Sequence, residues 1–223
     1  MIMRATIRQG LVWLVIAGAI VAAVATLRIM GRNAVTDVQL MQLRWQIGQW
    51  HAGQAPLPSI TEWGRARNAL AEGLRQTPDD PQIYEAMGYL YALQALSAAK
   101  QPTLFVPLMR QVKAYFENAG RLQPMSGTHW GNIALAQHLL VNVDASTNQK
   151  ALARLWDIYD QALSFGSQDS ATQRILVDIG TVRWNQMTAS RRMALEKMIK
   201  NAWPDQKEAL LIIAKKYDWM LSD

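Results

Sequence analysis

One spacing of residue types occurs three times in this chain and constrains its fold more than any other feature of the sequence. Each copy has an apolar residue, a large residue four positions later, a small residue three positions after that, and a helix-ending residue five positions further on. The copies are Ala66, Leu70, Gly73 and Pro78; Val112, Phe116, Ala119 and Pro124; and Leu155, Tyr159, Ala162 and Ser167. Intervals of four and three place side chains on one face of an α-helix. We therefore predict three helices, each with a small residue that lets a neighbouring helix cross closely.

A second kind of helix is predicted a few residues after each of these stops. The clearest start is at residues 77–81, where Pro78 and Pro81 bracket two aspartates, so one helix ends and another begins. The residues that share a face of these helices are Tyr84, Met87, Gly88 and Tyr91; Trp130, Ile133, Ala134 and Gln137; and, in the weakest match, Gln173, Leu176, Val177 and Gly180. Two alternating helix types predict an all-α, tetratricopeptide-like solenoid of helical hairpins over residues 59–223.

The repeats differ from the usual length of about 34 residues. We attribute the difference to long connections and predict loops at Lys100–Pro107 and Val143–Gln149. Ser59 or Thr61, followed by Glu62, is expected to start the first of the repeat helices.

Two further helices are predicted to close the end of the solenoid. Thr188 or Ser190 is expected to cap the first, Trp203-Pro204 to end it, and Asp205 to cap the last. The apolar residues expected along the last helix are Leu210, Ile213, Ala214, Tyr217 and Met220.

The amino-terminal segment has no charged residue between Gln9 and Leu27. A helix of this length spans about 28 Å, which matches the hydrocarbon thickness of a bilayer. We predict a transmembrane signal anchor within residues 1–32. A cleaved secretory signal, with Ala23-Val24-Ala25 as the cleavage site, is the alternative, and the length of the apolar run favours the anchor.

Charge alone does not orient this predicted anchor, because Arg4 and Arg8 before it are nearly matched by Arg28 and Arg32 after it. The short amino-terminal tail favours a large domain on the far side of the membrane.

Residues 33–58 are predicted to form a juxtamembrane helix and a linker. The helix would cover residues 34–50 and begin at Thr36 or Asp37. One face carries Val38, Met41, Trp45 and Gly48, and Leu43, Ile47 and Trp50 widen it. We expect this face to pack on the next helix rather than to lie on the membrane surface.

The composition excludes several classes of function. The formal net charge is +6, but removing the four arginines that flank the apolar segment leaves 19 basic against 17 acidic residues. No basic stripe of the kind that binds nucleic acid remains. The chain has no cysteine, which excludes disulfides, zinc thiolates and thiol catalysis.

The residues that most often perform chemistry are scattered. The histidines are His51, His129 and His138, and the last two are nine residues apart, so they do not have the spacing of a metal-binding pair. Asp79 and Asp80 suit a turn and a helix start better than a catalytic pair. We predict no metal site, no cofactor and no enzymatic activity.

A binding surface remains as the functional prediction, because the first helices of hairpins line the concave face of such a solenoid. The residues placed toward or near this face are Glu85, Tyr89, Asn132, His138, Arg174 and Asp178. Taken singly, each is more often an ordinary solvated residue than a binding hot spot.

Several segments together are similar to one family. They are the apolar amino-terminal segment, the helix from Trp63 to Pro78, DDPQIYEAMGYLYALQAL from Asp79, WGNIALAQ from Trp130, Ser164-Phe165-Gly166, the helix at Gln173, and Trp184 leading to Arg191-Arg192. In this order they resemble the VpsP-type, membrane-anchored tetratricopeptide-like proteins of bacterial exopolysaccharide biosynthesis and export loci. The resemblance implies a scaffold or accessory role that depends on binding other proteins of a polysaccharide complex, and it implies no catalytic residues.

Two other functions stay open. An assembly or chaperone adaptor for envelope proteins, such as a cytochrome maturation factor, would have the same fold and differ in its partners. An enzyme acting on glycans is disfavoured because the sequence shows no paired carboxylates.

Overall fold

The computed structural model describes the backbone of residues 2–143 and 149–221, and its side chains except at residues 2–15, 17, 29, 30, 32 and 33. Every regular element in these ranges is a helix, as predicted. The elements are α1 (Ile2–His51), α2 (Ile60–Gln76), α3 (Pro81–Ser97), α4 (Pro102–Leu122), α5 (Gly127–Val143), α6 (Gln149–Gly166), α7 (Ser170–Val182), the 3-10 turn η1 (Trp184–Gln186), α8 (Ala189–Lys200) and α9 (Pro204–Lys215).

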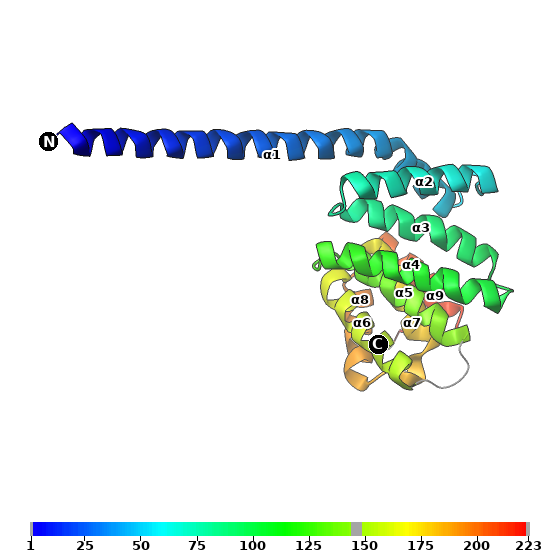
Figure 1. Cartoon of the computed structure of the whole chain (residues 1–223). Coiled ribbons are helices and arrows are strands. Elements are labelled where there is room, and N and C mark those ends of the chain that lie inside the picture. The colour runs from blue at the N-terminus through cyan, green and yellow to red at the C-terminus, as the bar shows by residue number, and fades with distance from the viewer. Residues whose placement is uncertain (1, 144–148, 222–223) are drawn as a thin grey trace.

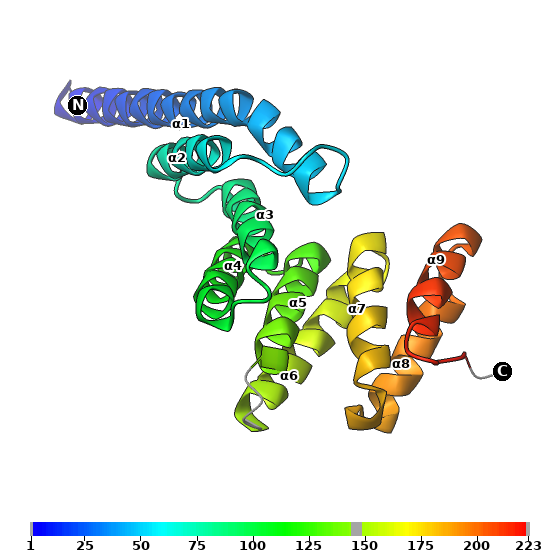
Figure 2. The same ribbon diagram turned by 90° about the vertical axis from the view of Figure 1, so that its right-hand side faces the viewer.

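The helices stack as successive antiparallel hairpins (Figures 1 and 2). Helices α3 and α4 form one hairpin and α5 and α6 the next, while α5 packs on α7 and α7 on α9. Helices α1 and α2 pack on α3, and the amino-terminal part of α1 projects away from the stack (Figure 1). This arrangement is compatible with the predicted helical solenoid.

The repeated spacing predicted the buried face of the second helices correctly. Its apolar, large and small positions in α2, α4 and α6 are all buried: Ala66, Leu70, Gly73, Val112, Phe116, Ala119, Leu155, Tyr159 and Ala162. The contact between α3 and α4 explains why α3 has a glycine at its small position. A Cβ atom at Gly88 would lie 2.7 Å from Cζ of Phe116, so the ring of α4 occupies the space that a side chain would need.

Most predicted helix starts are confirmed. Ser59 and Glu62 form a reciprocal capping box at α2, and Thr188 accepts a hydrogen bond from the amide of Arg191 at α8. Asp80 caps α3. The prediction for Asp205 is wrong, because Trp203 precedes α9 and Pro204 takes the first helical position, where a missing N–H costs nothing.

Helix α1 is continuous where two helices were predicted. Nothing between residues 28 and 36 breaks it, since the segment has no proline and a lone glycine costs only about 1 kcal/mol. Thr36 and Asp37 therefore lie inside the helix and cap nothing.

The packing face of α1 was predicted only in part. Ile47 and Trp50 are buried on the domain and Leu43 is partly buried, as predicted, and Thr36 and Leu40 complete this face, whereas Val38, Met41 and Trp45 are exposed. Both faces have intervals of three and four, and the residue pattern alone did not distinguish them.

Two further boundaries correct the predictions. Lys100–Pro107 is not a loop, because α4 begins at Pro102 and includes Pro107. Helix α9 ends at Lys215, so Tyr217 and Met220 lie beyond it. Val143 and Gln149 bound the second predicted loop, and residues 144–148 lie outside the described residues.

Among the residues whose side chains are described, no helix is both long and apolar enough to span a membrane. The predicted anchor includes residues 11–15 and 17, whose side chains lie outside that description.

Two hydrophobic clusters form the core. The smaller joins α1, α2 and α3 around Leu40, Leu70 and Ile83. The larger runs from the end of α3 to the carboxyl-terminal tail, and Tyr89 and Tyr91 contact both clusters.

Candidate binding groove

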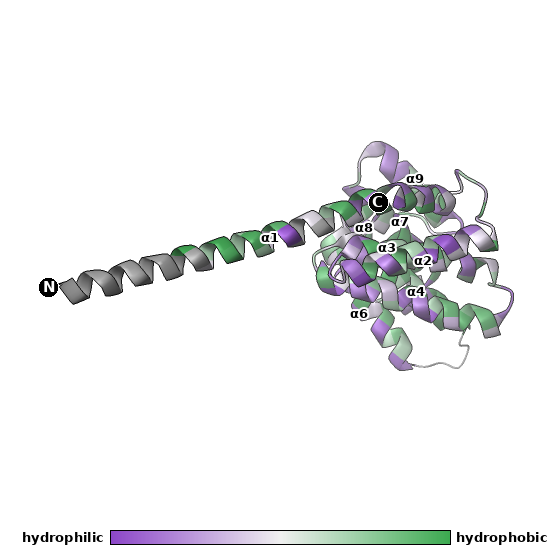
Figure 3. Ribbon diagram, turned by 45° about the horizontal axis from the view of Figure 1, so that its top comes forward, coloured by the Kyte–Doolittle hydropathy of each residue, from purple (hydrophilic) through white to green (hydrophobic). Residues whose placement is uncertain are grey.

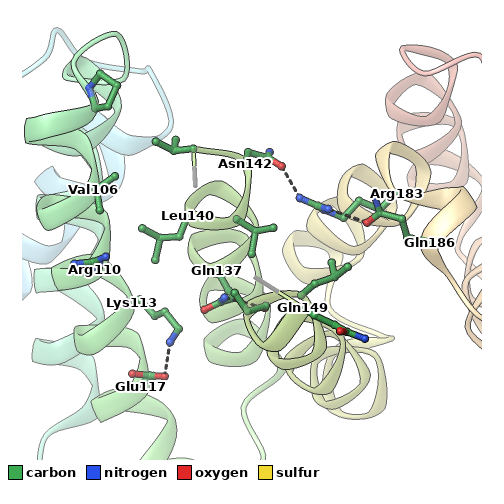
Figure 4. Close-up of a pocket in the computed structure, with 15 residues that line it drawn as sticks. Val106, Arg110, Lys113, Glu117, Gln137, Leu140, Asn142, Gln149, Arg183 and Gln186 are labelled. Carbon is green, nitrogen blue, oxygen red and sulfur yellow. Dashed lines mark hydrogen bonds and ion pairs between the residues drawn. The ribbon is translucent and has the colours of Figure 1, made fainter. Parts of the chain in front are cut away.

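A groove of about 980 Å³ lies between α4, α5 and the start of α6, and the turn after α7 closes one end (Figure 4). Its lining residues are Pro102, Val106, Arg110, Lys113, Glu117, Gln137, Leu140, Val141, Asn142, Val143, Gln149, Ala151, Leu152, Arg183 and Gln186. A volume of this size is at the upper end of the range for small-ligand pockets and is also sufficient for a short peptide segment.

Helix α4 contributes a charged wall. Val106, Arg110, Lys113 and Glu117 lie at helical intervals and so share the face that lines the groove. Nζ of Lys113 lies 3.0 Å from Oε1 of Glu117, and Nη2 of Arg154 lies 2.8 Å from the same oxygen. Arg110 is exposed, and among the described residues its guanidinium has no hydrogen-bond or ion-pair partner. It is the cation of this wall that is available to a ligand.

Arg183 provides a second cation on the other side of α5 (Figure 4). It is buried, and its Nε donates to Nδ1 of His138 at 3.0 Å. Its Nη1 donates to Oε1 of Gln186 at 2.9 Å and its Nη2 to Oδ1 of Asn142. Burial lowers the pKa of Arg183, but a guanidinium stays charged in proteins. Within the described ranges no carboxylate makes an ion pair with it, so its hydrogen-bond partners are neutral groups alone.

His138 accepts a hydrogen bond from the Arg183 side chain and so helps to hold it in place. Burial, and then the charge of Arg183, lower the pKa of His138 to about 4. The ring is therefore neutral at pH 7, and its Nδ1 can accept the hydrogen bond from Arg183. Its Nε2 lies 3.0 Å from Nδ2 of Asn142. With Nδ1 as the acceptor, the neutral ring carries its proton on Nε2, so this second contact brings two donors together and adds no hydrogen bond. The ring positions Arg183 and is not placed as a free general base.

Three of the six predicted binding residues lie together between α3 and α5. Nδ2 of Asn132 donates to the hydroxyl of Tyr89 at 2.9 Å, and Oε2 of Glu85 lies 3.5 Å from Nε2 of His129. Burial, with the nearby carboxylate of Glu85, raises the pKa of Tyr89 well above its usual range. This cluster links neighbouring hairpins.

The other three predicted residues lie apart from this cluster and from one another. His138 lies beneath the groove, next to Arg183. Asp178 accepts a hydrogen bond from the hydroxyl of Tyr217 at 2.9 Å, and Arg174 is exposed on α7. None of the six is among the residues that line the groove.

The sequence reasoning missed Arg110, Lys113, Arg183 and Gln186. The spacing of the α4 residues could have indicated a charged face, but residues 100–107 were predicted as a loop. No local pattern indicates the contact of Arg183 with His138, because the two residues are 45 positions apart.

The chemistry of this groove is that of binding. Its polar groups are two arginines, a lysine, the carboxylate of Glu117 and several side-chain amides. Glu117 is paired with Lys113 and Arg154, and the arginines and amides suit carboxylates, phosphates and hydroxyl groups. No cluster of three or more His, Asp or Glu side chains in the described part of the chain could hold a metal ion.

The described fold defines an all-helical protein whose hairpins stack in the manner of a helical solenoid. No protein-family model, curated protein or solved structure matches the chain.

Proposed function

We infer that this protein is a scaffold or accessory protein of exopolysaccharide biosynthesis or export, anchored in a bacterial inner membrane with its helical domain in the periplasm. In this proposal it acts by binding another protein of the machinery. The groove between α4, α5 and α6 takes a carboxylate-bearing segment of that partner.

The observation that carries the binding role is the pair of cations, Arg110 and Arg183, on opposite sides of one groove. Arg110 has no partner among the described residues, and Arg183 is held by neutral groups, so an incoming carboxylate would meet charge that is not already neutralised. The apolar stems of Val106, Leu140 and Leu152 would cover the partner's apolar atoms.

The sequence supports the proposed location at the membrane. The apolar segment between Gln9 and Leu27 has the length of a membrane span, and the family resemblance covers most of the chain. Solenoids of helical hairpins commonly provide extended binding surfaces.

A photo-crosslinking amino acid at Val106 in the groove, with the same probe at exposed Lys197 on α8 as the matched control, tests the proposal in intact cells. We expect the groove probe alone to capture polysaccharide synthase or export components. Capture of apocytochromes or secreted clients would instead support the envelope adaptor.

A charge reversal tests the same groove by function. Arg110→Glu removes one cation from an exposed position, so the fold is expected to survive and the yield or chain length of secreted polysaccharide to fall.

An unchanged yield and chain length of the polysaccharide after deletion of the whole gene would refute the proposed role. Cleavage of purified polymer by the isolated protein would favour the enzyme.

A further inference from the structure

Helix α1 has two distinct apolar faces. One packs on α2 and α3 through Thr36, Leu40, Ile47 and Trp50, with Leu43 partly buried beside them. At 100° per residue the other face, which contains Val38, Met41 and Trp45, lies roughly 180° away. These three side chains are 68%, 62% and 66% exposed, so none of the described residues covers the second face.

The uncovered face follows a strict heptad pattern, with intervals of three and four in alternation. Every position along it is apolar or glycine, and every one is exposed: Val24, Leu27, Gly31, Ala34, Val38, Met41, Trp45 and Gly48. We call these residues the α1 seam. The seam is about 36 Å long at 1.5 Å per residue.

The heptad period points to a helical partner. A repeat of 3.5 residues keeps its face directed toward another helix only when the two helices supercoil. A lipid surface would need apolar residues but no such period. The seam also continues to Gly48, well past the apolar segment that ends at Leu27, so lipid would not cover Val38, Met41 and Trp45. The hydropathy colouring of α1 changes from green to a mixture of purple, white and green toward the domain (Figure 3).

The charges beside the seam favour a second copy of the same chain in parallel orientation. In a parallel pair in register, Asp37 faces the Gln42 of the second copy and Arg44 faces its Gln49, so no like charges meet. Asp37 and Arg44 also form an ion pair within α1. An antiparallel pair that matched the whole seam would place Asp37 against the Asp37 of the second copy, which is repulsive.

The helical domain does not obstruct such a pair. It packs on the face of α1 opposite the seam, and the amino-terminal part of α1 extends beyond the domain (Figure 1). A pair related by a two-fold axis along the seam would carry its two domains on the outside.

We propose that the α1 seam, from Val24 to Gly48, binds the same seam of a second copy of this chain as a parallel two-stranded coiled coil. The dimer presents two helical domains, and with them two grooves, side by side.

Cysteine crosslinking tests the proposal directly, because the chain has no cysteine of its own. Val38→Cys and Trp45→Cys, each in the full chain in membranes, should give disulfide-linked dimers on mild oxidation, since equivalent seam positions face each other in a parallel pair. Gln39→Cys and Gln46→Cys are matched controls, one residue along α1, exposed and off the seam, and should stay monomeric.

The orientation has its own test. In an antiparallel pair that matched the whole seam, Val38 would face Ala34 of the second copy. A crosslink between mixed Val38→Cys and Ala34→Cys chains, with no crosslink within either chain type alone, would overturn the parallel arrangement. Crosslinks to a different protein, or equal crosslinking at Gln39 and Val38, would overturn the pairing itself.

A charge variant gives an independent measurement. Val38→Glu with Trp45→Glu should halve the mass of the purified full chain in detergent, measured by light scattering, while its helix content is unchanged because both side chains are exposed. A mass that is already monomeric before the substitution, or one that stays dimeric after it, would overturn the proposal.

Discussion

The backbones of Gly127 and Gly166 are in direct contact: a Cβ atom at Gly127 would lie 2.2 Å from the Cα of Gly166. The first turn of α5 and the last turn of α6 therefore meet at a point where neither helix has room for a side chain. Phe165 contributes to the same crowding, since its carbonyl oxygen would lie 2.8 Å from that Cβ. The close approach sets how near α5 and α6 lie to each other at the open end of their hairpin.

Gly127→Ala should destabilise the protein by about 3 kcal/mol, because the added methyl group meets backbone that cannot rotate away. Urea unfolding of the purified full chain, followed by circular dichroism, measures the change. Gly64→Ala is the control. No atom lies within 4 Å of a Cβ at Gly64, so this substitution within α2 should stabilise by up to about 1 kcal/mol. Equal effects at the two sites would contradict the crowding argument.

Ser59→Ala should cost about 1 kcal/mol, because it removes the hydroxyl that accepts the hydrogen bond from the amide of Glu62 at the start of α2. Thr61→Ala, two positions along and exposed, removes a hydroxyl that caps nothing and should change stability by a few tenths of a kcal/mol at most. The same unfolding measurement compares the two. A loss at Thr61 as large as that at Ser59 would show that the cap is not the cause.

Stability should fall as the pH drops from 7 to 5, because His138 is held neutral in the folded protein. Its folded pKa is about 4 against 6.5 for an ordinary histidine, so the unfolded chain binds a proton in this window and the folded chain does not. The expected loss is about 2 kcal/mol. Burial also lowers the pKa of His51, which adds a loss of the same sign.

His138→Gln separates these contributions. Its amide oxygen can replace Nδ1 as the acceptor for Arg183 but cannot take up a proton. The variant should therefore keep much of its stability at pH 7 and lose less between pH 7 and pH 5. Unfolding curves at the two pH values measure the difference, and an unchanged pH dependence would contradict the assignment to His138.

The sequence was sufficient for the repeat helices because their pattern is local. The intervals that join Val112, Phe116 and Ala119 specify one face of one helix, and burial of that face needs only a neighbour of the same kind. Gly88 could be recognised as a gap for the same reason, and Phe116 fills it. Asp80 and Ser59 act within one turn of their own position, so they too could be identified from the sequence.

The groove depends on contacts between distant parts of the chain, and the sequence does not display these. Arg183 contacts Asn142 and His138 only because α7 ends beside the end of α5. In α1, two faces with similar intervals were both apolar, and the choice between Leu40 and Val38 is made by the position of α2 and α3.

Because the core is divided into two hydrophobic clusters, we expect the two parts of the protein to unfold locally with different free energies. Leu70 lies fully buried in the cluster of α1, α2 and α3, and Leu176 lies fully buried in the larger cluster. Leu70→Ala should cost about 2–5 kcal/mol, because it leaves a cavity in a small core with few other contacts. Helix α2 and the packed end of α1 should then exchange their amide hydrogens faster, while α5 to α9 stay protected.

Leu176→Ala is the matched substitution in the other cluster, with the same change of side chain at the same burial. It should accelerate exchange in α5 to α9, whose buried residues belong to the same cluster as Leu176. Hydrogen exchange read by mass spectrometry on the purified full chain compares the two variants. If Leu70→Ala accelerated exchange equally in α2 and α7, the clusters would form one cooperative unit. Tyr89 and Tyr91, which contact both clusters, would then be the residues that couple them.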